Sequence, residues 1–173
     1  MEEHGIFIEK QVDESERKEH ETFLRMAIKL AEENVEHGLG GPFGAVICKD
    51  GKVIANGSNK VVPSNDPTAH AEVVAIRQAC SETNTYRLDG CVIYCSCEPC
   101  PMCLGAIYWS HVDQIFFANS KHDAAECGFD DHFIYEELAR ELHERKVRVT
   151  QLLEEEGIKA FALWASSSTK THY

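Results

Sequence analysis

The chain has 173 residues, of which 43% are hydrophobic, so it can form one domain with a buried core. Its formal net charge of −12 argues against a protein that binds nucleic acid through the phosphates, because such proteins carry a basic surface. The apolar runs are too short to cross a membrane, and the charged residues 1–21 do not form a signal peptide. We therefore expect a cytoplasmic protein that acts on a small molecule, with no nucleic-acid partner and no membrane partner.

The first predicted element is a helix that follows a charged leader. Residues 1–18 carry dense mixed charge with little apolar periodicity, so we expect a flexible leader there and one domain over residues 19–173. Apolar side chains then recur at helical spacing from Phe23 to Ala31. The glycines within residues 38–41 end this helix.

A β-hairpin and an alternation of helices and strands follow. Residues 43–48 and 52–55 are predicted strands, and Asp50-Gly51 between them is typical of a tight hairpin turn. Because strands alternate with helices, we predict an α/β domain with a mixed, mostly parallel five-stranded sheet. The later elements, in chain order, are a helix capped at Asp66-Pro67, a strand at 91–97, a helix at 99–110, a strand at 114–118, a helix at 130–144, a strand at 147–152 and a terminal helix at 153–165.

Two segments, residues 68–72 and 96–103, carry groups that bind metals. Cys100 and Cys103 are three residues apart, so on a helix their sulfurs project from one face and can reach a single tetrahedral ion. His70 supplies a nitrogen ligand, and two thiolates balance the charge of Zn²⁺. We predict one zinc ion per chain, held by these three residues.

Three protein ligands leave the fourth position of a tetrahedral site to water, which is the arrangement of a catalytic zinc. A structural zinc would be closed by a fourth residue, for which Cys95 or Cys97 would be the candidates. A catalytically silent zinc scaffold is therefore the non-enzymatic alternative, and it leaves Glu72 without a role. The cysteines other than Cys100 and Cys103 are expected to be free thiols in a reducing compartment.

Glu72 is the predicted catalytic acid and base, although it lies only two residues after His70. Positions i and i+2 do not share a helix face, so the spacing alone leaves open that Glu72 is an ordinary exposed glutamate. The combination of His-x-Glu with a later Pro-Cys-x-x-Cys is more informative than either half. It is the signature of zinc-dependent nucleobase deaminases, in which the glutamate moves protons and does not bind the metal.

The sequence resembles the guanine deaminases of the cytidine-deaminase superfamily from about Glu21 to Tyr173. Most of the matching blocks also recur, with variation, in tRNA adenosine deaminases, so they indicate the superfamily. The block Gly128-Phe-Asp-Asp131 and the aromatic C-terminus point to guanine. The remaining blocks are Gly41-Pro-Phe-Gly-Ala-Val46, Asn65-Asp-Pro-Thr-Ala-His-Ala-Glu72 and Cys97-Glu-Pro-Cys-Pro-Met-Cys-Leu-Gly-Ala-Ile107.

The resemblance implies a three-layer α/β/α fold and the hydrolysis of guanine to xanthine and ammonia. It implies that Asn59 binds the purine edge, that Phe43 packs against the base and that Asp131 meets the amino-side edge. It also implies a homodimer in which the C-terminal segment 153–173 crosses to the partner subunit. The other expected substrate-binding groups are the backbone amide of Ala71, Trp109 at the pocket wall and Tyr173 as part of a closing tail.

These residues also have plainer interpretations. Phe43 fits an ordinary core position, Asn59 a turn and Asp131 a helix cap, while Tyr173 would be frayed as a terminal residue. Among other enzymes, a tRNA adenosine deaminase should carry a basic face, which the net charge disfavours. A free cytosine or cytidine deaminase, or a deaminase of guanosine, adenine or another aminopurine, remains an alternative substrate assignment.

Overall fold

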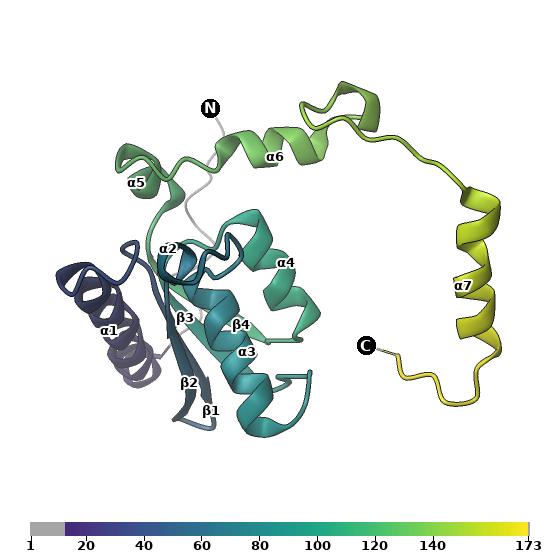
Figure 1. The fold of residues 1–173 in the computed structure, drawn as a ribbon. Helices are drawn as coiled ribbons and strands as arrows, with labels where there is room; N and C mark the ends of the chain where they lie inside the picture. Colours follow the sequence, from purple (N-terminus) through teal and green to yellow (C-terminus); the bar gives the residue numbers. More distant parts are fainter. Residues whose placement is uncertain (1–12, 173) are drawn as a thin grey trace. The chain divides into compact units, whose positions relative to one another are not determined.

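The computed structural model describes residues 13–172, which form two compact units that divide between Asp130 and Asp131. The first twelve residues of the predicted leader and Tyr173 lie outside the described residues. In the first unit, helix α1 (Glu14–Glu36) covers one face of a central sheet, and α3 (Ala71–Thr83) and α4 (Pro101–Trp109) lie on the other (Figure 1). The predicted three-layer α/β/α arrangement is confirmed.

The sheet of the first unit is mixed, as predicted, but only one of its strand pairings is parallel. Its order is β2 (Lys52–Ser58), β1 (Gly44–Lys49), β3 (Cys91–Cys97) and β4 (Gln114–Asn119). β1 runs antiparallel to both β2 and β3, and β3 runs parallel to β4. The expectation of a mostly parallel sheet was wrong because β1, the first strand of the hairpin, pairs antiparallel with β3 as well as with β2.

The predicted fifth strand at residues 147–152 does not form, so the sheet has four strands within the described residues. Alternating apolar residues make a strand only where a neighbouring strand supplies hydrogen-bond partners. This segment belongs to the second unit, in which the described residues include no strand. Val147 and Leu152 are accordingly 75% and 79% exposed.

Helix α1 starts inside the segment that composition assigns to the leader. Asp13 caps it by accepting a hydrogen bond from the Ser15 N–H, so residues 14–18 are helical. The charges of this first part are paired along the helix, with Lys18 beside Glu14 at 3.1 Å. The helix ends at Glu36, and Gly38 follows in the left-handed region, as the glycine-rich segment predicted.

The hairpin turn is confirmed, whereas the capping role of Asp66 is not. Asp50 and Gly51 have φ values of 49° and 69°, which are those of a tight turn with both central residues left-handed. The Asp66 carboxylate accepts hydrogen bonds from the backbone N–H and hydroxyl of Thr68 and forms a local turn after α2 (Val61–Ser64). Helix α3 therefore begins at Ala71, with His70 as its N-cap.

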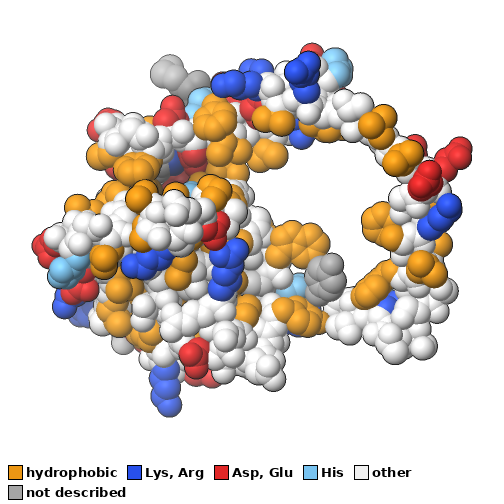
Figure 2. Space-filling view, viewed as in Figure 1, with side chains coloured by type: hydrophobic (Ala, Val, Ile, Leu, Met, Phe, Trp, Pro, Cys, Tyr) orange, Lys and Arg blue, Asp and Glu red, His pale blue; other side chains and the backbone are white. Residues whose placement is uncertain are grey.

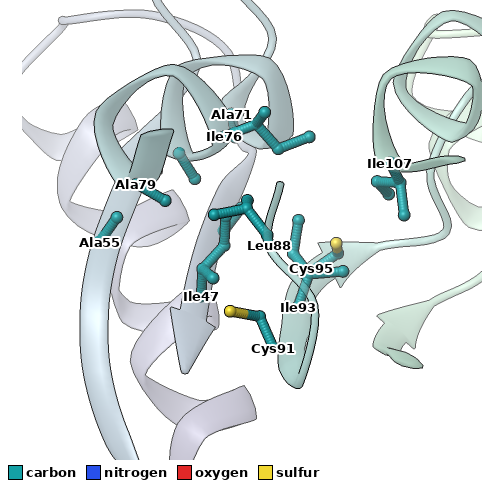
Figure 3. Close-up of a cluster of buried hydrophobic side chains, with 12 residues drawn as sticks. Ile47, Ala55, Ala71, Ile76, Ala79, Leu88, Cys91, Ile93, Cys95 and Ile107 are labelled. Carbon is teal, nitrogen blue, oxygen red and sulfur yellow. The ribbon is translucent and has the colours of Figure 1, made fainter. Parts of the chain in front are cut away.

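A cluster of buried apolar side chains between the sheet and α3 forms the core that supports the metal-binding segments (Figure 3). Ile47, Ile93 and Leu88 are almost fully buried there. Two neighbouring glycines let the helices approach the sheet closely, because Gly44 faces α1 and Gly57 faces α3. A Cβ at Gly57 would collide with the carbonyl oxygen of Ala71 and lie 2.7 Å from the Ala75 nitrogen.

After β4, a short helix α5 (Lys121–Glu126) completes the first unit, and the second unit contains α6 (His132–Ala139), a 3₁₀ turn (Leu142–Glu144) and α7 (Glu154–Ser166). The helix expected over residues 130–144 is therefore broken at Arg140, while the terminal helix is confirmed with its start one residue later. Hydrophobic side chains stand exposed along the second unit (Figure 2). Within residues 13–172, no helix is both long and apolar enough to cross a membrane.

We predict that Gly57→Ala destabilises the protein by about 1–3 kcal/mol, because the added methyl group must push α3 away from β2. It should also weaken metal binding, since Ala71 lies between His70 and Glu72. The control is Gly105→Ala, where a Cβ meets nothing within 4 Å and a helix-interior alanine should stabilise by about 0.5–1 kcal/mol. Urea unfolding measures both, and equal effects of the two substitutions would contradict the prediction.

Candidate metal centre

The three predicted metal ligands lie at the N-termini of two helices. His70 is the N-cap of α3, and Cys100 is the N-cap of α4, both with extended backbone. Pro101 occupies the first position of α4, where its missing N–H costs no hydrogen bond, and Cys103 lies one turn further along. The first backbone N–H groups of both helices have no intrahelical partners. The region around His70, Cys100 and Cys103, which is called the corner below, therefore carries a positive potential that favours thiolates.

The distances between the three side chains fit a single tetrahedral ion. Nδ1 of His70 lies 3.5 Å from the sulfur of Cys100 and 3.5 Å from that of Cys103. Ligands held at zinc–sulfur and zinc–nitrogen distances of ~2.3 Å and ~2.0–2.1 Å in tetrahedral geometry stand roughly 3.6 Å apart. Two soft sulfurs and one imidazole nitrogen are also the donor set that zinc prefers. The residues present therefore fit zinc.

The electrostatics of the two cysteines favour a bound cation. A hydrogen bond from the Cys103 thiol lowers the pKa of Cys100 to about 4, and the neighbouring His70 acts in the same direction. The same hydrogen bond, together with burial, raises the pKa of Cys103. The hydrogen bond between His70 and Cys100 in turn raises the pKa of His70. The pair thus holds one negative charge readily, and a second thiolate needs a bound dication beside it.

Glu72 points into this corner although it is offset by two positions from His70. It lies in the first turn of α3, is only 7% exposed and has a hydrogen bond with Cys103. Burial raises the pKa of its carboxyl group, and the negative charge of Cys100 adds to this effect. The i and i+2 offset does not separate the two side chains because His70 lies outside the helix as its cap. The exposed-glutamate interpretation is therefore wrong.

Cys95 and Cys97 do not join the metal-binding group. Within residues 13–172, only His70, Cys100 and Cys103 bring three such ligand atoms together, all within 4.8 Å of one another. The Cys97 thiol instead donates to the carbonyl oxygen of Ser120 at 3.5 Å, and burial raises its pKa to about 11. The fourth ligand that a structural site would need is not supplied by either cysteine.

Two of the predicted substrate-binding residues, Phe43 and Asn59, flank the hairpin of β1 and β2. The amide oxygen of Asn59 accepts from the backbone N–H groups of Gly41 and Val61, and the residue is 7% exposed. The backbone N–H of Asn59 donates to the carbonyl of Phe43 at 3.0 Å. The Phe43 ring meets Phe129 edge-to-face with centroids 4.9 Å apart. The hydrogen bonds of Asn59 leave its amide nitrogen as the end that can donate to a ligand.

The other predicted binding residues are distributed over the chain. Ala71 is fully buried at the first position of α3, where its N–H has no intrahelical partner. Trp109 is the last residue of α4, at the opposite end of this helix from Cys100, and is 67% exposed. Asp131 is the N-cap of α6, where its side chain makes no capping hydrogen bond. Tyr173 lies outside the described residues.

Sequence reasoning missed two residues that support the site. Phe129 lies inside the Gly128–Asp131 block but was given no role, although it packs against Phe43. Asn34 is buried in α1 and holds the loop that carries Asn59. A polar residue on the otherwise apolar face of a helix is the sequence feature that could have revealed Asn34.

Comparison with known proteins agrees with this geometry. Residues 17–119 match the family model described as the cytidine and deoxycytidylate deaminase zinc-binding region. The chain is 54% identical to the guanine deaminase of Bacillus subtilis over 89% of this chain and 99% of the relative. An X-ray structure of guanine deaminase from that species matches with a TM-score of 0.87, covering 89% of this chain and 98% of the other.

Similarity to other deaminases covers less of the chain. The tRNA-specific adenosine deaminase of Aquifex aeolicus is 41% identical over 64% of this chain and 74% of the relative. A structure of guanine deaminase from Nitrosomonas europaea is 35% identical with a TM-score of 0.61, covering 64% of each chain. The matched zinc-binding region and the His/Cys/Cys group confirm the prediction of one zinc ion as cofactor.

We predict that Cys103→Ala lowers the zinc content below one ion per chain, because it removes one of three ligands and leaves Cys100 without its hydrogen-bond donor. The thermal stability should fall as well, since metal binding is coupled to folding. Cys97→Ala is the matched control and should keep one zinc, because its thiol is bound to Ser120. Metal analysis by mass spectrometry measures the zinc content of both variants. Full zinc content in Cys103→Ala would show that Cys103 is not a zinc ligand.

Proposed function

Because the chain belongs to the cytidine and deoxycytidylate deaminase family, we propose that it hydrolyses guanine to xanthine and ammonia with one bound zinc ion. The choice of guanine rests on the similarity to guanine deaminase, which extends over 89% of this chain. The reaction type rests on one observation above all. A buried glutamate, Glu72, lies in hydrogen-bond contact with Cys103 of the metal-binding group.

We assign Nδ1 of His70 and the sulfurs of Cys100 and Cys103 as the zinc ligands. When bound, zinc supplies a water molecule whose pKa is about 7, so that the water can lose a proton near neutral pH. The two helix N-termini favour the thiolate forms of the sulfurs, and the bound dication stabilises the second thiolate. Cys95 and Cys97 stay neutral, since burial raises the pKa of both thiols.

Glu72 moves the protons of the reaction. Its carboxylate accepts a proton from the water that attacks C2 of guanine, and it delivers this proton to a ring nitrogen. It then transfers the proton of the new C2 hydroxyl group to the amino group, so that the carbonyl of xanthine forms as the C2–N bond breaks and ammonia leaves. Because burial raises the pKa of Glu72, its carboxylate is a stronger base than an exposed one. General acid–base transfer of this kind contributes ~10²–10⁴-fold to the rate.

Three groups of the first unit position the base. The amide nitrogen of Asn59 donates to the purine edge, because its oxygen is already held by backbone N–H groups. Phe43, supported by Phe129, packs against the base. The free N–H of Ala71 at the start of α3 is available to the substrate during attack.

Three further residues carry the assignment to guanine. Asp131 accepts from the N–H groups on the amino side of guanine, a donor set that adenine lacks. Trp109 contributes to the pocket wall, and Tyr173 belongs to the tail that closes the site. The roles of Asp131 and Tyr173 rest on the resemblance of the Gly128–Asp131 block and the aromatic C-terminus to guanine deaminases, and that of Trp109 rests on the general resemblance to this family.

Deamination of adenosine in tRNA is the alternative that similarity to a known protein supports. The Aquifex aeolicus enzyme covers only 64% of this chain, and a net charge of −12 does not suit a polyanionic substrate. Other aminopurines differ from guanine at one or two ring substituents and remain outcomes of a substrate screen.

We predict that the zinc-loaded protein releases ammonia from guanine faster than from adenine, guanosine, cytosine or cytidine. Glu72→Gln should keep the zinc and the fold while kcat for guanine falls by ~10²–10⁴-fold, because the amide cannot carry the proton. A coupled ammonia assay and metal analysis give both readings. Release of ammonia only from another substrate would replace guanine, and a near-normal kcat in Glu72→Gln would remove this residue from the mechanism.

We propose that the protein is a homodimer in which the C-terminal segment 153–173 crosses to the partner. In α7, the side chains of Ile158, Phe161 and Leu163 are 58%, 71% and 72% exposed. A second copy of the chain would cover this apolar surface, since an exchanged segment is a common route to symmetric dimers.

Mixed dimers test whether the tail acts across the interface. A chain that lacks residues 170–173 keeps Glu72, and a Glu72→Gln chain keeps its tail. If tails act in the partner's site, a mixed dimer has one site with both, so activity absent from each parent should reappear. Equal inactivity of confirmed mixed dimers and parents would show that the tail acts within its own chain or not at all.

We also propose a cytoplasmic location. All eight cysteines are free thiols, and burial keeps most of them from reaction. Free thiols in this number, two of them in a metal-binding group, fit a reducing compartment.

A further inference from the structure

We propose that Asn34 is a positioning residue that fixes the orientation of Asn59 toward the substrate by tying α1 to two loops of the site. This inference deepens the proposed function and rests on it. Asn34 lies on α1, near its C-terminal end, and is only 2% exposed. A buried asparagine is costly unless all its hydrogen bonds are made, so its partners indicate its purpose.

The side-chain amide of Asn34 joins two carbonyl groups that are distant in the sequence. Its nitrogen Nδ2 donates to the carbonyl oxygen of Gly41 at 2.9 Å and to that of Asn59 at 3.0 Å. Each of its two N–H groups therefore has one acceptor. Asn34 thereby ties the glycine-rich loop after α1 to the residue that ends the hairpin region.

Lys60 fixes which way the amide of Asn34 points. The ammonium group of Lys60 donates to the amide oxygen Oδ1 of Asn34 at 3.4 Å. Lysine has no acceptor, so the oxygen must face it and the nitrogen must face the two carbonyls. The opposite orientation would place an oxygen against two other oxygens, which is why a carboxylate cannot replace this amide.

The loop that contains Gly40 and Gly41 packs tightly against Asn34 and Asn59. A Cβ at Gly40 would collide with the carbonyl oxygen of Asn59 and lie 2.8 Å from Nδ2 of Asn34. The same loop returns a hydrogen bond, because the Gly41 N–H donates to the side-chain oxygen of Asn59. Asn34 therefore holds the backbone of Asn59 while the loop that it anchors holds the side chain.

The consequence concerns substrate binding more than zinc chemistry. Asn59 is hydrogen-bonded to Phe43 through its backbone, so both residues assigned to the purine depend on this network. The metal ligands lie at the N-termini of α3 and α4, and the hydrogen bonds of the Asn34 side chain go to Gly41, Asn59 and Lys60 instead. Loss of the Asn34 donors should therefore weaken guanine binding and leave the zinc site in place.

The test is Asn34→Asp, which keeps the size and the contact with Lys60 but removes both donors. We expect KM for guanine to rise roughly tenfold, the equivalent of about 1.4 kcal/mol, while kcat and zinc content stay near their normal values. The matched control is Ala27→Gly, another buried position of α1, which weakens the helix without touching the network. A general loss of stability lowers the active fraction and hence the apparent kcat, and it spares KM.

A second measurement is independent of the substrate. Hydrogen exchange followed by mass spectrometry should show faster exchange in residues 38–43 and 59–61 of Asn34→Asp, with residues 70–74 and 101–104 unchanged. An unchanged KM together with unchanged exchange in the two loops would overturn the proposal, as would an equal rise of KM in Ala27→Gly. If the normal protein does not deaminate guanine, the proposed function fails, and the exchange pattern alone decides the role of Asn34.

Discussion

The close contact between α3 and the hairpin strand β2 is the constraint on which the site depends. Gly57 packs beneath the carbonyl of Ala71, the residue that separates His70 from Glu72. On the opposite face, its neighbour Gly44 lets α1 approach, so both layers of helices are set by two adjacent glycines. The N-terminus of α3 is thereby fixed relative to β1 and β3, and β3 leads directly to Cys100. A metal centre built from two helix caps tolerates little shift of either helix, because ligand distances are fixed to a few tenths of an ångström.

The metal-binding group and Glu72 are electrostatically dependent on each other. Burial and the charge on Cys100 both raise the pKa of Glu72, and the charge of Glu72 in turn raises the pKa of Cys103. A corner that gathers two thiolates and a carboxylate out of water is unfavourable by itself. A dication at the centre of the three ligands removes this conflict and lets all these groups ionise. Because the dication lets Glu72 ionise, the same site that binds zinc also allows the Glu72 carboxylate to act as a base.

The sequence predicted the parts of this structure that depend on short spacings. The turn at Asp50-Gly51, the C-terminal end of α1 and the ligand trio follow from residue types a few positions apart. The errors arose where a local pattern had two solutions. Asp66 uses its carboxylate in a local turn with Thr68 and so does not cap α3, and residues 147–152 have the alternation of a strand but no strand beside them. The role of Asn34 depends on carbonyl groups 7 and 25 residues away, which no local pattern contains.

The division of the chain after Asp130 separates the residues that bind the metal from the segment proposed to help select the substrate. The first unit holds the metal-binding trio, Glu72 and the Asn34 network, and it satisfies its buried polar side chains internally. The second unit begins at Asp131 and exposes large apolar side chains along α7. Zinc chemistry needs rigid ligands and therefore belongs in a core that is packed on both faces of a sheet. Selection of one purine needs contacts that form around the base after it has bound. A segment that can move onto its neighbour and bury its own apolar surface can supply such contacts. The proposed exchange of α7 between subunits would bury that surface.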